Sequence, residues 1–132
     1  LPRRSPKKLM PTRHAKIYFM RNHQNQLFIR RREEKGLLGG MMELPSSEWS
    51  VKHFNDLDES SLTLGIVKWK QIPNKVRHTF THFHLEMQVL EGVVGENTDL
   101  TGVWCNLGDL NKYAFPSLMK KVLKHSISYL KL

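Results

Sequence analysis

Residues 76–89 are the stretch that most constrains what this chain can fold into. Apolar and polar residues alternate over residues 76–80, and the alternation resumes over residues 83–89. A period of two is typical of a half-buried strand, and the polar pair Thr81-His82 separates the two runs. The pattern predicts two strands joined by a tight turn whose tip is available to a partner. The alternative is a buried hairpin whose histidines only form hydrogen bonds.

The first half of the chain contains a second predicted hairpin. Strand patterns over residues 14–21 and 27–30 flank a polar turn, which favours two antiparallel strands. A glycine-rich segment over residues 36–45 follows, and its glycines predict unusual backbone angles or close approach. Ser46 is a suitable N-cap, so we expect a short helix over residues 48–54. Another strand is expected at residues 62–69.

The C-terminal third ends in the clearest helix of the sequence. An apolar run at residues 102–105 predicts an edge strand, and residues 107–113 predict a short helix or turn. Pro116 suits the first turn of a helix. Beyond it, apolar residues recur every three or four positions and predict one buried face: Leu118, Met119, Val122, Leu123, Ile127 and Leu130. The whole pattern predicts an α+β domain in which a twisted sheet packs against helices.

Composition limits the classes of function. The 132 residues suffice for one domain with its own core, and residues 1–13 read as a basic, proline-rich interdomain linker before a domain at 14–132. The start at Leu1 suggests a piece of a longer protein. No apolar stretch is long enough to span a membrane, and the single Cys105 gives neither a disulfide nor a zinc pattern, which favours a cytoplasmic protein. The net charge of +9 favours a polyanionic partner such as nucleic acid.

Three motifs together resemble a known family. They are the glycine segment over residues 36–45 followed by Trp49, the stretch over residues 77–83, and the sequence Phe115-Pro116-Ser117. In this order and spacing they resemble the C-terminal domain of the MutY adenine DNA glycosylase family of bacteria. The likeness extends over the whole chain and implies a Nudix-like fold, with a mixed β-sheet flanked by helices.

The resemblance also implies a role in DNA repair. Such a domain recognises 8-oxoguanine opposite adenine in duplex DNA, while an N-terminal domain of the same chain, which carries an iron–sulfur cluster, excises the adenine. The family's lesion-contacting loop matches Phe80, Thr81 and His82, with Thr81 in place of the usual serine. A hydroxyl remains, and it can accept a hydrogen bond from the N7–H that distinguishes 8-oxoguanine from guanine. Met42 stands where the family often has tryptophan, and we interpret it as a core residue.

The basic residues near the predicted turns are expected to contact phosphates, which position DNA without reading its sequence. These residues are Arg30, Arg31, Arg32, Lys75 and Arg77. The alternative for each is a solvated surface charge. We expect Trp49, Trp69 and Trp104 in the core rather than as stacking platforms. We expect His78, His82 and His84 on one side of the hairpin, and we expect no metal site among the histidines.

A metal-dependent Nudix diphosphatase of the 8-oxo-dGTP type is the main alternative function. Such enzymes need a helix that carries an Arg-Glu and a Glu-Glu cluster downstream of the glycine pair, because its carboxylates bind the divalent ions. Gly39-Gly40 and Glu43 are present, but residues 46–61 contain no arginine and no glutamate pair. We therefore expect no catalytic residue, metal or cofactor in this domain. A protein-interaction module with a basic docking linker is the third possibility.

Overall fold

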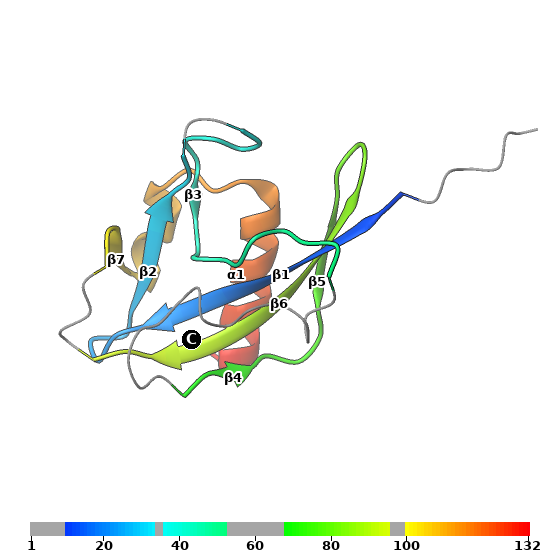
Figure 1. The fold of residues 1–132 in the computed structure, drawn as a ribbon. Helices are drawn as coiled ribbons and strands as arrows, with labels where there is room; N and C mark the ends of the chain where they lie inside the picture. Colours follow the sequence, from blue (N-terminus) through cyan, green and yellow to red (C-terminus); the bar gives the residue numbers. More distant parts are fainter. Residues whose placement is uncertain (1–9, 34–35, 53–67, 96–99) are drawn as a thin grey trace, which may run out of the picture.

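The structure is a computed structural model that describes residues 10–33, 36–52, 68–95 and 100–132. Its described strands form one mixed sheet (Figure 1), in which β3-β2-β1-β6-β4 is the main path, while β5 pairs with β6 and β7 with β2. The strands are β1 (Thr12–Arg21), β2 (Gln26–Arg31), β3 (Met42–Glu43), β4 (Lys70–Gln71), β5 (Val76–Thr79), β6 (His84–Val93) and β7 (Val103–Asn106). A 3-10 helix, η3 (Leu107–Lys112), and the helix α1 (Ser117–Leu130) complete the fold. The predicted α+β class with a mixed sheet and flanking helices is confirmed.

The two long strands at the centre run parallel. β1 and β6 pair along their whole lengths, from Thr12 opposite His84 to Arg21 opposite Val93. β1 therefore begins two residues before the strand predicted from the alternation, because the backbone N–H of His84 donates to Pro11 O at 2.9 Å and extends the pairing. A parallel pair needs a long connection, so the sequence pattern of either strand did not reveal its partner.

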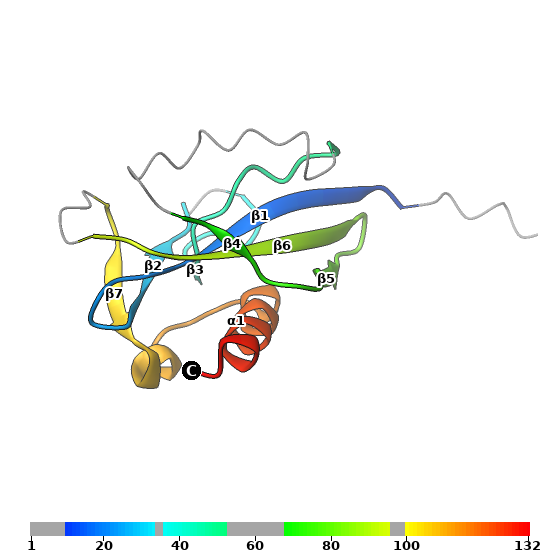
Figure 2. The same ribbon diagram turned by 90° about the horizontal axis from the view of Figure 1, so that it is seen from below.

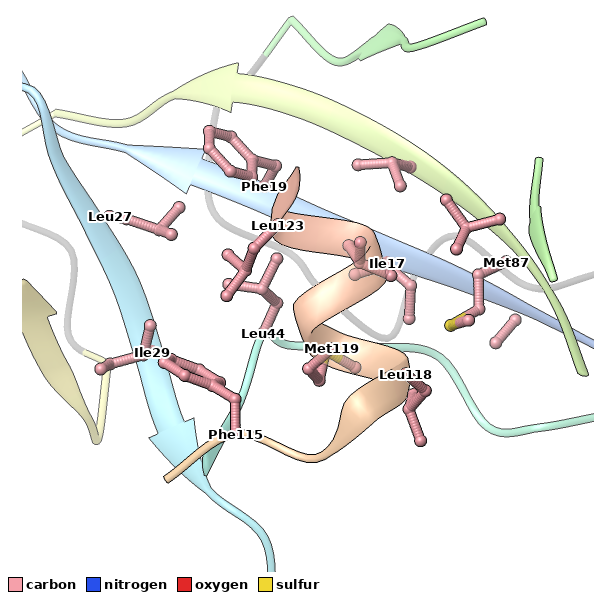
Figure 3. Close-up of a cluster of buried hydrophobic side chains, with 14 of the residues drawn as sticks. Ile17, Phe19, Leu27, Ile29, Leu44, Met87, Phe115, Leu118, Met119 and Leu123 are labelled. Carbon is pink, nitrogen blue, oxygen red and sulfur yellow. The ribbon is translucent and has the colours of Figure 1, made fainter. Parts of the chain in front are cut away.

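The main core lies between the sheet and α1. Residues 15–20 of β1 are all buried, and Ile17 and Phe19 join side chains of the helix below the sheet (Figures 2 and 3). The predicted apolar face of α1 is confirmed: Leu118, Met119, Val122 and Leu123 are buried, and Ile127 and Leu130 pack against the same cluster. Met42 is a core residue, as predicted.

Several shorter predictions are also confirmed. The hairpins β1–β2 and β5–β6 form, and β7 pairs only with β2 among the described strands, as expected of an edge strand. The glycine segment contains three left-handed backbone conformations, at Gly36 (φ 98°), Leu38 (φ 61°) and Gly40 (φ 81°). The predicted strand at residues 62–69 lies outside the described residues except for 68 and 69, which are not in a strand. No helix in the described part of the chain is long and apolar enough to cross a membrane.

The predicted helix at residues 48–54 is wrong over its described part. Residues 48–52 are not helical, and Ser46 and Ser50 form bridges to Ile17 and His14 of β1. Ser47 donates its backbone N–H to Lys16 O at 2.9 Å, and its hydroxyl accepts the N–H of Lys16 at 2.8 Å. Ser46 therefore caps no helix. The side of β1 that faces away from β6 pairs with β2 only at Arg21, so its other backbone groups are better partners than a short, marginal helix would be.

The expectation that His78, His82 and His84 share one side of the hairpin is also wrong. Phe80 pairs with Phe83, so the loop has only two residues, and Thr79 stands opposite His84 while His78 stands opposite Leu85. Residues directly opposite each other share a face, so His78 and His84 point to opposite faces of the sheet. Across a two-residue loop, even-numbered residues of β5 share a face with odd-numbered residues of β6. The prediction assumed instead that every second residue stays on one face through the loop.

Candidate functional site

The strongest candidate site is the tip of the β5–β6 hairpin, residues Phe80–Phe83, called the hairpin tip from here on. The N–H of Phe80 donates to Phe83 O at 2.8 Å, and the side chains of Thr81 and His82 are exposed beyond this pair. The two favoured two-residue hairpin turns need positive φ at one or both central residues. Neither Thr81 nor His82 has positive φ, so a different turn presents them to solvent.

An aromatic cluster of Trp49, Phe80 and Phe83 supports the hairpin tip from below. The ring centroid of Phe80 lies 4.7 Å from that of Phe83 and 5.7 Å from that of Trp49, both tilted by 30°. His78 adds an edge contact to Phe80 at 4.8 Å. All three rings of the aromatic cluster are half-buried and pack on the main core. The exposed polar pair is therefore held on a rigid base.

Two arginines lie over the rings of this cluster. The guanidinium carbon of Arg13 is 4.6 Å from the centroid of Phe83, and that of Arg32 is 4.9 Å from the ring of Trp49. Cations in this position are attracted to the face of the ring, which carries negative charge. The hairpin tip is thus flanked by two fixed positive charges that come from distant parts of the sequence.

Sequence reasoning missed Arg13 and assigned Trp49 to the core. Arg13 fell at the predicted linker, and only the parallel pairing of β1 with β6 brings it beside Phe83. Trp49 is half-buried rather than buried, and its position depends on the bridges between residues 46–50 and β1. No local pattern signals either contact, because both need long-range strand pairing.

Arg30 and Arg32 belong to a second group, the arginine cluster, in which both bind Glu43. Arg30 Nε lies 2.9 Å from Glu43 Oε2, and Arg32 Nη1 lies 2.9 Å from Glu43 Oε1. The strand register explains the arrangement, since Glu43 of β3 stands opposite Arg30 of β2 and Arg32 follows two residues later on the same face. Both oxygens of this buried carboxylate are therefore engaged.

The arginine cluster lines a cleft of about 690 Å³. Its charged lining residues are Arg30, Arg31, Arg32, Glu33, Glu43 and Glu48, so the formal charges of the cleft cancel. Arg31, unlike Arg30 and Arg32, does not bind Glu43. Its Nη1 donates to Gly40 O at 3.3 Å. Within the described residues, no three His, Cys, Asp or Glu side chains are grouped so that they could hold a metal ion. Asp56, Asp58 and Glu59, the other acids downstream of the glycine pair, lie outside the described residues.

The remaining predicted phosphate contacts are not gathered at the hairpin tip. Lys75 precedes β5 at the end away from the tip, and Arg77 is exposed on β5 opposite Glu86. Of the five predicted cations, only Arg32 reaches the hairpin tip, through its contact with Trp49.

On the face of β5 opposite to Arg77, Lys121 Nζ lies 3.1 Å from His78 Nδ1. The Lys121 ammonium group can only donate, so His78 Nδ1 accepts this hydrogen bond. Burial, with a smaller contribution from Lys121, lowers the pKa of His78.

A family model described as NUDIX domain matches residues 17–125. The chain belongs to the NUDIX domain family. Two solved structures share this fold closely: a MutT protein from Methanosarcina mazei Go1 (TM-score 0.72, 18% identity, covering 95% of this chain and 99% of that one) and the C-terminal domain of mouse MUTYH in complex with human PCNA (TM-score 0.70, 16% identity, covering 90% of each chain). MutT from Aliivibrio salmonicida and Vibrio cholerae is also similar (TM-score 0.58, 17% identity, covering 89% and 98%). A search of curated protein sequences finds no match.

The residues matched by the family model include the segments that stand out in the sequence of this NUDIX domain. The glycine segment and Glu43 lie within the matched residues, and so does the β5–β6 hairpin. At these identities the solved structures establish the fold that the chain shares with both kinds of protein. Because MutT proteins and the MUTYH C-terminal domain share this fold, the fold alone does not decide the function of this chain.

Proposed function

We propose that this NUDIX domain recognises 8-oxoguanine opposite adenine in duplex DNA, on behalf of an adenine-excising domain in the same protein. The observation that carries the proposal is the hairpin tip, which exposes a hydroxyl and an imidazole on a rigid aromatic base between two arginines. In this proposal Phe80 packs at the lesion, while Thr81 and His82 contact it. The protein acts in the bacterial cytoplasm, where its DNA substrate lies.

The chemistry of the lesion fits a short polar loop. 8-Oxoguanine has an N–H at N7, where guanine has only an acceptor, and an oxygen at C8. The Thr81 hydroxyl both accepts and donates, so it is able to accept from N7–H and reject guanine, which offers no donor there. The pairing of β5 with β6 continues to the Phe80–Phe83 hydrogen bond, so only the two residues between them have to be ordered on binding.

Diphosphate hydrolysis, the rival activity of the family, finds less support in the described residues. Glu43 is the carboxylate that survives beside the glycine pair, and two arginines already neutralise it. A divalent ion would have to displace both guanidinium groups to use these oxygens. Magnesium-dependent turnover of an oxidised deoxynucleoside triphosphate by this chain would contradict the proposal.

The phosphate contacts follow from which basic side chains are exposed. Arg31, Lys75 and Arg77 are exposed, whereas Arg30 and Arg32 present to solvent only the N–H groups that Glu43 leaves unused. We expect the first three to contact DNA phosphates and the last two mainly to hold the site in shape. Iron–sulfur chemistry belongs, in this proposal, to the excising domain and not to these residues.

The decisive experiment uses the protein with its excising domain and compares adenine excision from 8-oxoguanine:adenine and guanine:adenine duplexes. Thr81→Val removes the hydroxyl at constant shape, and Thr81→Ser keeps it. We expect Thr81→Val, Phe80→Ala and His82→Ala to lose lesion preference, and Thr81→Ser to retain it. His23→Ala, at an exposed histidine of the β1–β2 turn, is the control and should change nothing. Equal effects of the tip variants on both duplexes would overturn the recognition role.

A further inference from the structure

The exposed side of α1 carries a row of lysines that the proposed site does not use. Lys120, Lys121 and Lys124, called the lysine face from here on, stand at helical spacing on the side away from the core, and all three are exposed. Residues 117–132 contain no aspartate or glutamate, and the first turn of α1 is likewise without an acid. In the part of the chain that the structure describes, no carboxylate lies within 4 Å of any of the three ammonium groups.

The lysine face is physically continuous with the hairpin tip. Lys121 donates to His78 Nδ1 at 3.1 Å, and the ring of His78 contacts Phe80 of the tip. One turn further along the helix, His125 Nε2 lies 2.9 Å from Pro73 O, in the turn that precedes β5. α1 therefore lies alongside β5 (Figure 2), and Lys121 lies at the contact between the two elements.

Unpaired positive charge in a row favours one class of partner. Duplex DNA presents phosphates at regular intervals, and a lysine that neutralises one of them releases a bound counterion. Mobile ammonium groups suit such contacts, because they tolerate small changes in phosphate position. The lysine face also borders a shallow hollow of about 430 Å³ lined by Lys121, Lys124, His125, Ser128 and Tyr129, whose polar groups add hydrogen-bond donors.

We propose that the lysine face of α1 binds the phosphate backbone of duplex DNA next to the base pair held at the hairpin tip. The proposal rests on the proposed function for the choice of partner, but it concerns a different surface. It assigns the larger part of the sequence-independent affinity to α1, in addition to the phosphate contacts expected of Arg31, Lys75 and Arg77, and the reading of the base to β5–β6. The arginine cluster, whose charges Glu43 and its neighbours balance, contributes much less.

The test measures binding of the chain to an undamaged duplex by fluorescence anisotropy at several salt concentrations. Lys120→Gln/Lys124→Gln removes two charges and leaves Lys121 on His78. Each lost phosphate contact lowers the slope of log affinity against log salt by about 0.9, so we expect a decrease of about 1.8. Lys52→Gln/Lys70→Gln removes the same charge from two exposed lysines that also have no ion pair with a described carboxylate, and it should change the slope far less. Thermal unfolding of both variants checks that they fold.

Three outcomes decide the matter. A loss confined to the α1 variant supports the proposal, and equal losses in both double variants overturn it, because net charge alone would then explain binding. A third arm uses vesicles of anionic phospholipid: if the α1 variant loses vesicle binding but keeps DNA binding, the face is a membrane surface and the proposal is wrong. Because the duplex is undamaged, these results do not depend on lesion preference. Failure at the hairpin tip would appear separately, in the excision ratio of the Thr81 variants.

Discussion

The arginine run, Arg30–Arg32 at the end of β2, and the lysine face of α1 are both basic in the sequence. In the structure they differ in whether carboxylates neutralise their charge. Arg30 and Arg32 both bind the buried Glu43, and Glu33 and Glu48 line the same cleft. The lysines of α1 have no carboxylate within ion-pair distance among the described residues. One basic region is internally neutralised, and the other is available to a polyanion.

The difference teaches that a run of basic residues is not yet a basic surface. The arginine run is denser along the chain and was the better candidate for phosphate contacts by sequence. However, the strand register places Glu43 opposite it, and a guanidinium can hold a carboxylate with several N–H groups in fixed geometry. Lysines on a helix without acids keep their charge for a partner. The same comparison predicts how each region responds to mutation.

Removing the carboxylate at the centre of the arginine cluster should have the largest effect. The Glu43 side chain is only 7% exposed, whereas those of Arg30 and Arg32 are 37% and 25% exposed. Glu43→Gln loses two hydrogen bonds between charged groups, while the arginines can turn to water, so we expect unfolding to become easier by about 2 kcal/mol. The released arginines should then resemble the lysine face, and the salt dependence of duplex binding should steepen.

Glu48→Gln is the control for that variant, because it removes the same charge from an exposed position on the same cleft. Urea unfolding should be nearly unchanged, and the salt slope should shift much less than in Glu43→Gln. If both variants bind DNA equally well, the cluster is not neutralised by Glu43 in particular, and the comparison between the two regions breaks down.

The next largest effect should be a difference in stability between variants of the neighbouring residues Arg32 and Arg31. Arg32→Gln loses both the ion pair with Glu43 and the contact with Trp49, and we expect a cost of about 1 to 2 kcal/mol in the free energy of unfolding. Arg31→Gln loses one long hydrogen bond to Gly40 O, and we expect less than about 0.5 kcal/mol. Chemical denaturation measures both. A larger effect at Arg31 would show that exposure, not pairing, determines the role of each arginine.

The smallest effect should come from pH at the contact between the lysine face and the hairpin. Burial, and then Lys121, lowers the pKa of His78 below its ordinary value of 6.5, so the unfolded chain binds a proton more readily than the folded one. The stability contributed at this position is therefore complete above pH 6.5 and is lost as the pH falls through 6.5 towards the folded pKa. The melting temperature, followed between pH 7.5 and 5.5, should fall less in His78→Gln than in the natural sequence. Identical profiles would contradict the assigned cause.

Elements with strong local signals were predicted well. The period of two gave both hairpins, and the spacing of three and four gave α1 and its buried face, because these patterns depend on nearest neighbours in one element. The hairpin tip was located because a polar pair interrupts an alternating run. In each case the sequence alone encodes the geometry, and tertiary contacts only reinforce it.

Features that depend on pairing between distant segments were not predicted. Ser46 was predicted to cap a helix over residues 48–54, but Ser46 and Ser50 form bridges to β1 instead. His78 and His84 read as neighbours on one side of the hairpin, but the two-residue loop places them on opposite faces. Arg13 read as linker, and the parallel register with β6 places it over Phe83. The corrections for the serines and for Arg13 have the same cause, since the partner strand lies many residues away. The correction for the histidines is local and depends on the length of the loop.

The sequence by itself determined the α+β class, the two hairpins, the C-terminal helix and the exposed pair Thr81-His82. Only the tertiary structure decided which charges are free. It placed Glu43 between Arg30 and Arg32, and it left Lys120, Lys121 and Lys124 without a described carboxylate partner. The physical reason is that strand alternation and helical periodicity are local properties of a chain. The electrostatic state of a side chain depends instead on whichever charge the fold brings within a few ångströms of it.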